Sequence, residues 1–551
     1  MKLSAFKVEN YRSLKQVSLE NMAELNVLIG KNSSGKSNLL EAMNMFFSEF
    51  EPVKGATPGL NEYIWHKGST GPVVFEATFE VTGDQLTGLP AEDQAFLTSV
   101  FGKTVPSILK ITRSLTNAQG VWKTDSIVWG IIVMVKDDVP QLSPNLKIDS
   151  PTLERILKIV SQMIKSRFRL LGASRDVRGG DRFRTTVLDE NAQTSLWNLQ
   201  QSTSLRDEEK YVEVETAFSE VTSLRLDPAQ ARLMVRKGSR RFPLGLEGGG
   251  TQGAANVLFA SLVETDDFTI LGIEEPGIHG HPRLQRRLCR EIERIARRRQ
   301  VLISTHSPTV VDALPNASTW MVEFEDGQTR VAQADDLRRL LRELGSRPSD
   351  ALFSDRIVVV EGMPDRMVLE AFARRLGIDL ADVAFVTTRG RGSETPAKTL
   401  EALVSAAGGA LIPAFVILDA DRSAEASRLV EAKLIPKQQV HVWKAGSIES
   451  YYPADVLRDA LQAISTRYSL NLNVNKYVQE FQSGKLSPNR IDIGDKARRL
   501  DSSWEMTLAE EVAARLERSQ SDPPTEIRDT LAAIGTAQTT TSSSSSGPNS
   551  A

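Results

Sequence analysis

The pattern of apolar and polar positions divides the chain into two stretches of α/β character. In the first stretch, residues 3–29 alternate as short strands do, and residues 25–29 form a mostly apolar run that precedes a glycine-containing turn and a helix-like segment. In the second stretch, strand and helix patterns restart after a linker predicted at residues 345–350. Alternation of this kind predicts parallel sheets covered by helices, so we expect an α/β multidomain protein.

The region between these stretches carries weaker patterns. Residues 60–150 are strand-like and rich in turns, whereas residues 151–225 shift toward helix with one strand-like segment that starts at Phe168. Residues 283–299 predict an amphipathic helix, whose arginines we interpret as a solvated face. No heptad run of coiled-coil length lies before residue 275, which predicts a compact first domain.

The turn after residues 25–29 has the sequence G-x-x-x-x-G-K-S, which is the pattern of a phosphate-binding loop. Its glycines let successive backbone N–H groups point at the phosphates of a nucleotide, in front of the positive end of the following helix. The lysine would reach the β- and γ-phosphates and the serine hydroxyl would contact Mg²⁺. The predicted ATP-binding residues of this loop are Gly30, Asn32, Gly35, Lys36 and Ser37.

Three later segments carry related chemistry. A glycine cluster that contains Gly249 leads into a helical stretch, where a helix N-terminus can bind an anion. An apolar strand at residues 268–273 ends in Glu274 and Glu275, and a carboxylate there can hold Mg²⁺ while its neighbour activates the attacking water. A second apolar strand ends at His306, which can touch a γ-phosphate.

In this order, the four segments resemble the ABC-type ATPase head of the SMC, Rad50 and RecF class. The resemblance implies that Glu274 binds Mg²⁺, that Glu275 is the catalytic base, and that His306 senses the γ-phosphate. It also implies that Gly249 completes the ATP site of a second copy, so the protein would be a homodimer or a higher homo-oligomer. Two residues depart from the family pattern: Glu274 replaces the usual aspartate, and glycine replaces the signature serine, which predicts slow hydrolysis unless Thr251 supplies the missing hydrogen bond.

Carboxylates also follow the apolar strands of the second stretch. The strand at residues 356–360 precedes Glu361, and the strand at residues 414–418 precedes Asp419 and Asp421. Because carboxyl ends of parallel strands meet at one sheet edge, these groups can hold Mg²⁺ or Mn²⁺ for phosphodiester hydrolysis. As alternate residues of an extended strand, Asp419 and Asp421 should point to the same side. The predicted metal and catalytic residues here are Glu361, Asp365, Asp419, Asp421, Lys444 and Glu449.

This segment resembles the TOPRIM domain of topoisomerases, bacterial primases and some nucleases, with its motif positions at Glu361, Asp365, Asp419 and Asp421. An ABC-type head followed by a TOPRIM domain resembles the overcoming-lysogenization-defect family of ATP-dependent nucleases. The resemblance implies an ATP-regulated, metal-dependent DNA endonuclease of bacterial defence or DNA processing, in some cases with a helicase-like protein partner.

Two other functions fit parts of the pattern. A DNA clamp or sensor that switches with ATP and does not cut would need no carboxylate set in its second domain. A topoisomerase would need a tyrosine nucleophile, for which Tyr451 and Tyr452 are candidates, but strand-passage domains have no visible counterpart.

Composition limits these functions only in part. The formal net charge of the 551 residues is -3, so a DNA-binding surface must be a local patch. The six arginines between Arg167 and Arg184 could contact a phosphate backbone or could form an ordinary solvated loop. The single cysteine, Cys289, excludes an internal disulfide and fits a cytoplasmic protein. No uncharged run is long enough to span a bilayer comfortably, so we expect no membrane segment.

These observations predict a domain order. The predicted parts are an ATPase domain at residues 1–345 with a helical, dimerisation-type insertion at 151–225, a TOPRIM domain at 354–455, a helical segment at 456–530 and a disordered tail at 535–551.

Overall fold

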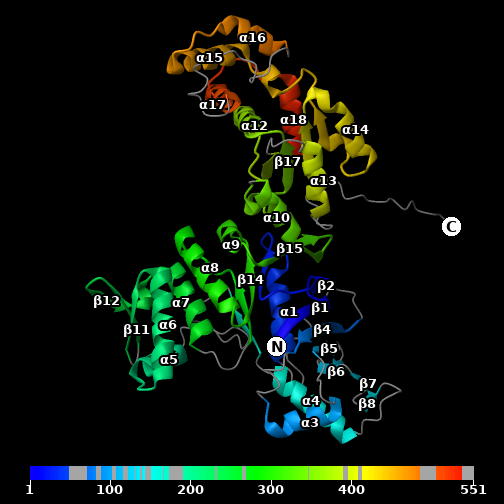
Figure 1. The fold of residues 1–551 in the computed structure, drawn as a ribbon, viewed down its shortest axis with the longest axis vertical. Helices are drawn as coiled ribbons and strands as arrows, with labels where there is room; N and C mark the ends of the chain where they lie inside the picture. The colour runs from blue at the N-terminus through cyan, green and yellow to red at the C-terminus, as the bar shows by residue number, and fades with distance from the viewer. Residues whose placement is uncertain are drawn as a thin grey trace, which may run out of the picture. The chain divides into compact units, whose positions relative to one another are not determined.

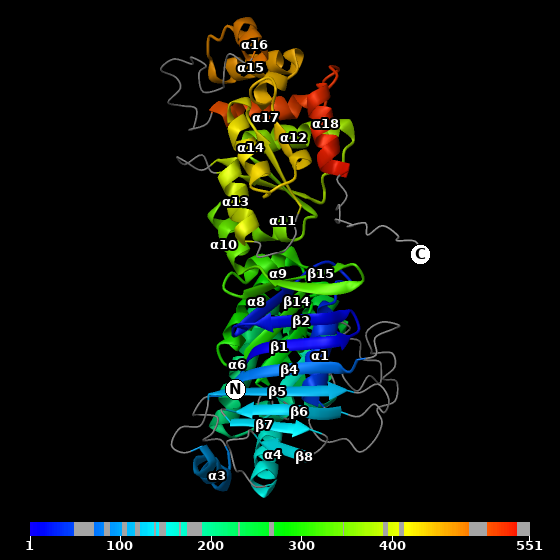
Figure 2. The same cartoon turned by 90° about the vertical axis from the view of Figure 1, so that its right-hand side faces the viewer.

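The computed structural model divides the chain into two compact units, Met1–Asp335 and Asp336–Ala551, which are considered separately (Figures 1 and 2). The arginine-rich loop predicted around residues 175–184 and the tail from residue 537 onward lie outside the described residues. Described are residues 1–48, 71–81, 89–101, 107–115, 122–129, 131–136, 139–142, 150–164, 167–172, 190–229, 232–263, 269–344, 346–388, 395–406, 413–483 and 504–536.

A six-stranded sheet of order β16-β15-β3-β14-β13-β9 forms the centre of the first unit. Its strands run parallel except β16, which pairs with β15 in the antiparallel direction. Strands β3, β13 and β14 are buried along their whole length, which explains why their sequences are mostly apolar. The strands are β3 (Leu25–Ile29), β9 (Phe168–Leu171), β13 (Ile270–Glu274), β14 (Gln300–Thr305), β15 (Ser318–Glu325) and β16 (Gln328–Gln333).

A second sheet of the same unit is antiparallel, with the order β2-β1-β4-β5-β6-β7-β8 among the described residues (Figure 2). In β4, buried and partly exposed residues alternate, as expected for a sheet with one face on the core. The strands are β1 (Lys2–Tyr11), β2 (Leu14–Glu20), β4 (Val73–Glu80), β5 (Ile108–Leu115), β6 (Trp122–Trp129), β7 (Ile131–Lys136) and β8 (Val139–Leu142).

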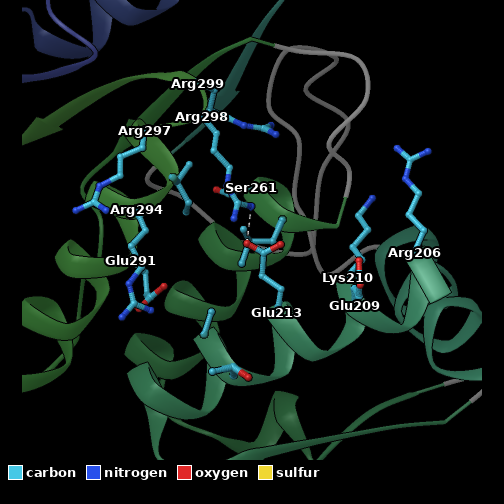
Figure 3. Close-up of a pocket in the computed structure, with 14 residues that line it drawn as sticks. Arg206, Glu209, Lys210, Glu213, Ser261, Glu291, Arg294, Arg297, Arg298 and Arg299 are labelled. Carbon is cyan, nitrogen blue, oxygen red and sulfur yellow. Dashed lines mark hydrogen bonds and ion pairs between the residues drawn. The ribbon is translucent and has the colours of Figure 1, made fainter.

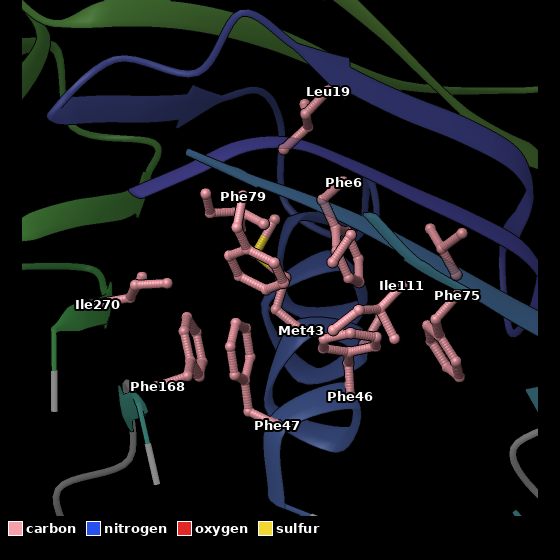
Figure 4. Packing of buried hydrophobic residues seen from close by; sticks show 14 of the residues in the cluster. Phe6, Leu19, Met43, Phe46, Phe47, Phe75, Phe79, Ile111, Phe168 and Ile270 are labelled. Carbon is pink, nitrogen blue, oxygen red and sulfur yellow. The ribbon is translucent and has the colours of Figure 1, made fainter. Parts of the chain in front are cut away.

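Helix α1 (Lys36–Ser48) packs against strands of both sheets (Figure 4). Phe46 meets Phe6 of β1 edge-on with ring centroids 6.0 Å apart, and Phe47 stacks on Phe168 of β9 at 5.5 Å. These buried aromatic pairs fix the helix whose first turn follows the predicted phosphate-binding loop.

The remaining described part of the first unit is mostly helical, and stacked Phe218 and Phe259 join α6 to α7. Helices α4, α5 and α6 fall in the region where sequence predicted a shift toward helix. The helices are α3 (Ala91–Phe101), α4 (Ser150–Ile164), α5 (Glu190–Gln201), α6 (Leu205–Thr222), α7 (Gly249–Leu262), α8 (Pro282–Ala296) and α9 (Pro308–Ala313). A small antiparallel sheet contains β10 (Arg225–Ala229), β11 (Arg232–Lys237) and β12 (Arg240–Pro243).

The second unit is built on a four-stranded parallel sheet of order β18-β17-β19-β20. Its strands are β17 (Arg356–Val360), β18 (Val383–Thr387), β19 (Ala414–Leu418) and β20 (Val440–Val442). The helices up to residue 431 are α10 (Asp335–Glu343), α11 (Pro348–Leu352), α12 (Met363–Leu376), α13 (Pro396–Ala406) and α14 (Ser423–Glu431). Part of the predicted linker is therefore helical, because α11 begins at Pro348.

The C-terminal helices share a core with this sheet. Phe372 of α12 belongs to the same buried cluster as Leu508 and Val512 of α17. These helices are α15 (Ala454–Tyr468), α16 (Val474–Gln482), α17 (Trp504–Leu516) and α18 (Thr525–Thr536). The predicted fold class, a multidomain α/β protein with C-terminal helices, is confirmed.

Candidate nucleotide-binding and metal-binding sites

The predicted phosphate-binding loop connects β3 to α1 and needs both of its framing glycines. Gly30 and Gly35 have φ angles of 154° and 105°, which side-chain-bearing residues rarely adopt. A Cβ atom on Gly30 would lie 2.1 Å from the backbone oxygen of Val322, and one on Gly35 would lie 2.1 Å from Thr329 Oγ1. The loop therefore packs directly on the β15 and β16 strands.

A chain of hydrogen bonds holds this loop to the turn between β1 and β2. Thr329 Oγ1 donates to the backbone oxygen of Ser34 at 2.9 Å and lies 2.8 Å from Ser13 Oγ. Ser13 Oγ accepts from Asn38 Nδ2 at 2.8 Å, and Arg12 Nη1 donates to Asn38 Oδ1 at 3.1 Å. The sequence indicates that Arg12, between the first two strands, could lie near the nucleotide or be only an exposed turn residue, but it does not indicate Thr329, because no local signal links residue 329 to this turn.

Lys36 is buried at the start of α1 and close to both predicted carboxylates. Its Nζ donates to the backbone oxygens of Gly30 and Lys31, each at 2.7 Å. Burial lowers the pKa of Lys36, and the nearby Glu275 and Glu274 carboxylates oppose that effect. The ammonium group and the two carboxylates therefore share one electrostatic environment.

Sheet topology explains why segments so distant in sequence meet. Strand β14 lies between β3 and β13, with Ile29 opposite Thr305 and Ser304 opposite Glu274. Because the three strands are parallel, the loop, His306 and the two glutamates follow strand ends on the same edge of the sheet.

Hydrogen bonds fix the Glu275 carboxylate at this edge. The backbone N–H of His306 donates to it at 3.0 Å, Thr305 Oγ1 donates at 3.1 Å, and His306 Nδ1 lies 2.7 Å from Glu275 Oε1. Glu275 also has a φ angle of 45°, an uncommon backbone conformation for this residue type. In contrast to the buried Glu274, Glu275 is partly exposed and so open to a water molecule.

The predicted signature glycines begin helix α7 and contact the turn that follows Glu275. Gly249 is exposed in the first helical turn, where backbone N–H groups lack helical partners. Gly250 is buried, and a Cβ atom there would lie 2.5 Å from Gly280 Cα. Asn32 in the loop and Ser37 in the first turn of α1, both exposed, complete the set predicted to bind ATP.

In the second unit, predicted carboxylates gather after the adjacent parallel strands β17 and β19. Burial and the neighbouring Glu361, Glu449 and Asp421 carboxylates raise the pKa of Asp419 to about 8. Burial, followed by Glu449 and Asp419, raises the pKa of Asp365, and burial also raises that of Glu449. All five carboxylates therefore belong to one electrostatic cluster.

The expected geometry of Asp419 and Asp421 is wrong. Strand β19 ends at Leu418, and Asp421 lies in the 3-10 turn Ala420–Arg422. The two aspartates therefore do not share one face of an extended strand, although Asp421 lies near enough to raise the pKa of Asp419.

Arg422 is a member of this cluster that the sequence did not indicate. Its Nε donates to Glu361 Oε1 at 2.6 Å, and its Nη1 donates to Glu425 Oε1 at 3.1 Å. The guanidinium group thus balances part of the negative charge at the strand ends.

The donor chemistry of the cluster fits Mg²⁺ or Mn²⁺, because carboxylate oxygens are the ligands these ions prefer. Burial first, and then repulsion between neighbouring carboxylates, raises the pKa values of Asp365 and Asp419, and a divalent cation would relieve that repulsion. Among the described residues, no three His, Cys, Asp or Glu side chains are grouped closely enough to hold one ion. Binding therefore requires these side chains to approach one another, with Glu361 giving up or sharing its bond to Arg422.

Lys444 lies in different surroundings from the predicted metal ligands. Its backbone N–H donates to Tyr451 Oη at 3.1 Å and to Glu526 Oε1 at 3.2 Å, and its side chain is exposed. It lines a cavity of about 520 Å³ with His441 and Glu526. No contact described for Lys444 joins it to the carboxylate cluster.

The two tyrosines are poor candidates for a topoisomerase nucleophile. Tyr451 Oη donates to Glu526 Oε2 at 2.6 Å, and burial, together with that bond, raises the pKa of Tyr451 to about 12. Burial raises the pKa of Tyr452 as well. Both phenols resist the deprotonation that nucleophilic attack needs.

No helix in the described part of the chain is both long and apolar enough to cross a membrane.

Three family models match separate parts of the chain. Residues 1–89 match an AAA ATPase domain, and residues 152–312 match an AAA domain described as a putative AbiEii toxin of a type IV toxin–antitoxin system. Residues 352–421 match the TOPRIM domain of overcoming lysogenization defect protein-like proteins. The last match includes Glu361, Asp365, Asp419 and Asp421 but ends before Lys444 and Glu449.

Curated relatives match over short segments. The DNA replication and repair protein RecF of Staphylococcus epidermidis is 51% identical over 43 residues, which is 8% of this chain and 12% of that protein. RecF of Anaeromyxobacter sp. is 40% identical over 73 residues, 13% of this chain and 19% of that protein. The uncharacterized protein MJECL10 of Methanocaldococcus jannaschii is 35% identical over 64 residues, 12% and 29% of the two chains. The chain thus spans less than a third of these relatives.

Solved structures also show similarity. The SMC head domain from Thermotoga maritima is 13% identical with a TM-score of 0.35, over 60% of this chain and 99% of that chain. An Smc head bound to the C-winged helix domain of ScpA is 11% identical with a TM-score of 0.39, over 60% and 97%.

Proposed function

We propose that this chain, which belongs to the overcoming-lysogenization-defect family of proteins that join an ATPase head to a TOPRIM domain, is an ATP-regulated, divalent-metal-dependent DNA endonuclease. The observation that carries the proposal is the carboxylate cluster after β17 and β19, since a domain that only switches with ATP has no use for it. Four of its members, Glu361, Asp365, Asp419 and Asp421, lie within the segment that matches the TOPRIM model.

In the proposed nuclease site, Glu361, Asp365, Asp419, Asp421 and Glu449 would hold Mg²⁺ or Mn²⁺. When bound, such ions supply positive charge to the attacking and leaving oxygens of a phosphodiester. Asp365 is already oriented, because its Oδ2 accepts the backbone N–H of Gly362 at 2.9 Å.

Arg422 could act on the phosphate itself. Once a cation takes over the charge of Glu361, the guanidinium group is available to a phosphate oxygen, for which its planar donors are well suited. Lys444 could serve this purpose only after a rearrangement, given its present neighbours Glu526 and His441.

At the ATPase head, we propose that Lys36 leaves the backbone oxygens of Gly30 and Lys31 to bind the phosphates of ATP. Glu274 and Ser37 would hold the accompanying Mg²⁺, and Glu275 would accept a proton from the attacking water. The hydrogen bonds from Thr305 and His306 support this role, because they aim the Glu275 carboxylate.

A second copy of the chain completes this proposed site. Gly249 and Thr251 lie in the first turn of α7, and the exposed Gly249 together with the partly exposed Thr251 could present N–H groups to the γ-phosphate bound by a neighbouring copy. ATP binding would then join two heads and regulate cutting by the TOPRIM domains. A cytoplasmic role in bacterial anti-phage defence or DNA processing, with a helicase-like partner in some settings, follows from the family and is part of the proposal.

The alternative is a non-cutting DNA clamp or sensor that switches with ATP. It is favoured by the short matches to RecF proteins. The mutually repelling carboxylates of the second unit, most of them partly buried, weigh against it, because they lower stability without a cation.

Supercoiled plasmid incubated with the full chain separates the two functions. We expect nicked or linear product with Mg²⁺ or Mn²⁺, none with a chelator, and a rate that changes when ATP is added. Plasmid that stays supercoiled with both ions, with and without ATP, while the protein retards it on a gel, would favour the clamp.

A further inference from the structure

The arginines at the end of α8 are not simply a solvated face, as the sequence suggested. They line a hollow of about 840 Å³ between α6, the end of α7 and α8 (Figure 3). Figure 3 shows Arg206 and Lys210 on α6, and the arginines at and after the end of α8 on the other side. The cationic residues of this hollow are Arg206, Lys210, Arg294, Arg297, Arg298 and Arg299.

A second hollow extends the first along the same helices. It has a volume of about 460 Å³, shares Glu291 and Arg294 with the first hollow, and adds Arg287 and Arg290. At about 1.5 Å per residue, the helix covers about 10 Å between Arg287 and Arg294, and residues 297–299 continue the row. We call the two joined hollows the α6–α8 groove.

Positive charge exceeds negative charge in this groove. The first hollow contains six cationic side chains and three glutamates, of which Glu213 pairs with Arg298 at 2.5 Å and Glu291 pairs with Arg294 at 3.0 Å. Among the described residues, the side chains of Arg206, Lys210 and Arg297 form no hydrogen bond or ion pair. Three cations are therefore available to a ligand.

We propose that the α6–α8 groove binds the phosphodiester backbone of a nucleic acid. Arginine recognises phosphate through its planar donors, and a row of such residues neutralises successive phosphates. A single hollow would be enough to hold a compact nucleotide. The length of the two joined hollows therefore favours an extended polyanion as the ligand. The ion pairs with Glu291 and Glu213 restrict the positions of the Arg294 and Arg298 guanidinium groups in the groove.

The α6–α8 groove lies in the first unit, and its residues are outside both predicted sites. Its proposed role rests on the proposed function only in the choice of DNA as the probe. The chain net charge of -3 makes a local site necessary for such binding, since the protein as a whole does not attract nucleic acid.

A matched pair of triple variants tests the proposal in the full chain. The groove variant carries Arg206→Ala, Lys210→Ala and Arg297→Ala, which remove the three cations that have no partner. The control variant carries Arg225→Ala, Lys237→Ala and Arg240→Ala in the β10 to β12 sheet, where the side chains are exposed. Both variants lose two arginines and one lysine, so they have the same net charge.

Binding of a fluorescently labelled duplex is measured with a chelator present, so that no cutting occurs, over a series of salt concentrations. In a plot of log Kd against log salt, we expect the slope of the groove variant to fall by about 2–3, because each lost phosphate contact contributes about 0.9. The control variant should keep the wild-type slope, and both variants should bind ATP as the wild type does. The loss should be the same for duplexes of different sequence.

Three results would overturn the proposal. The first is that the groove variant binds DNA with wild-type affinity. The second is that both variants lose DNA affinity equally. The third is that the groove variant loses binding of inorganic triphosphate but keeps wild-type binding of DNA. Plasmid cleavage by the wild type is measured separately. The groove proposal can therefore be refuted while the nuclease proposal stands, and the nuclease proposal can be refuted while the groove proposal stands.

Discussion

The contact between Gly250 and Gly280 leads to a sharp prediction about the ATPase head. In the Gly250→Ala variant, the added Cβ would lie 2.5 Å from Gly280 Cα, 2.8 Å from Gly280 N and 2.9 Å from the backbone oxygen of His279. All three atoms are backbone, so no side chain can turn away. The neighbouring Gly249 has its nearest atom, His279 Cδ2, at 3.7 Å, which is an ordinary contact.

The magnitude follows from comparing the two substitutions. Overpacking of a tight interior typically costs about 1–3 kcal/mol. Replacing glycine by alanine in a helix recovers up to about 1 kcal/mol at either position. The difference in the free energy of unfolding between Gly249→Ala and Gly250→Ala should therefore approach the overpacking cost of about 1–3 kcal/mol.

Thermal unfolding of the two variants measures this difference. We expect Gly250→Ala to melt below Gly249→Ala, by about 2 °C for each kcal/mol. ATP turnover should fall in Gly250→Ala as well, because Gly280 and Glu275 belong to one hydrogen-bonded turn. In this turn, the backbone N–H of Gly280 donates to the Gly277 oxygen at 2.7 Å, and that of Ile278 donates to the Glu275 oxygen at 3.1 Å. Equal melting temperatures would refute the packing of α7 on this turn.

Three further predictions concern the two sites. Lys36→Ala should weaken ATP binding at least tenfold, about 1.4 kcal/mol, because the loop keeps its N–H groups but loses its buried ammonium; unchanged affinity in a nucleotide titration would contradict the loop assignment. Glu275→Gln should retain ATP binding and slow turnover by about 10²–10⁴, and turnover at the wild-type rate would place the base elsewhere. The pKa of Asp419 is raised to about 8 in the folded chain, whereas it is about 4 in the unfolded chain. The protonated carboxyl therefore stabilises the fold at low pH, and this contribution to the free energy of unfolding is lost as the pH rises toward 8. With a chelator present, the melting temperature of the wild type should fall as the pH rises from about 4 to 8, and that of Asp419→Asn should fall less. Added Mg²⁺ should raise the melting temperature of the wild type again. If the melting temperatures of both proteins changed equally with pH, Asp419 would not be responsible.

The sequence predicted those parts of the molecule that depend on local pattern. The loop between β3 and α1 was found because an apolar strand, two glycines and a helix stand in one short segment. Glu274, Glu361 and Asp419 were found because each follows a buried strand, and parallel strands bring such residues to a common edge.

The remaining features depend on residues that are distant in sequence. Arg422 could not be assigned to Glu361, because the 3-10 turn after β19 replaces the extended backbone that the Asp-Ala-Asp sequence suggested. The α6–α8 groove combines Lys210 and Arg298 across 88 residues, and each helix alone has the composition of an ordinary solvated surface. Lys444 was placed with the metals because it follows β20, but its backbone N–H is directed to Tyr451 and Glu526.

Plasmid cleavage by Asp419→Ala tests the central claim most directly. The substitution removes a carboxylate from the centre of the cluster, whereas the control Asp459→Ala removes an exposed aspartate of α15 in the same unit. We predict that Asp419→Ala binds ATP and DNA as the wild type does but leaves supercoiled plasmid intact across a Mg²⁺ and Mn²⁺ series, while Asp459→Ala cuts normally. Cleavage by Asp419→Ala at the wild-type rate, with contaminating nuclease excluded, would contradict the account and show that this carboxylate cluster is not the nuclease site.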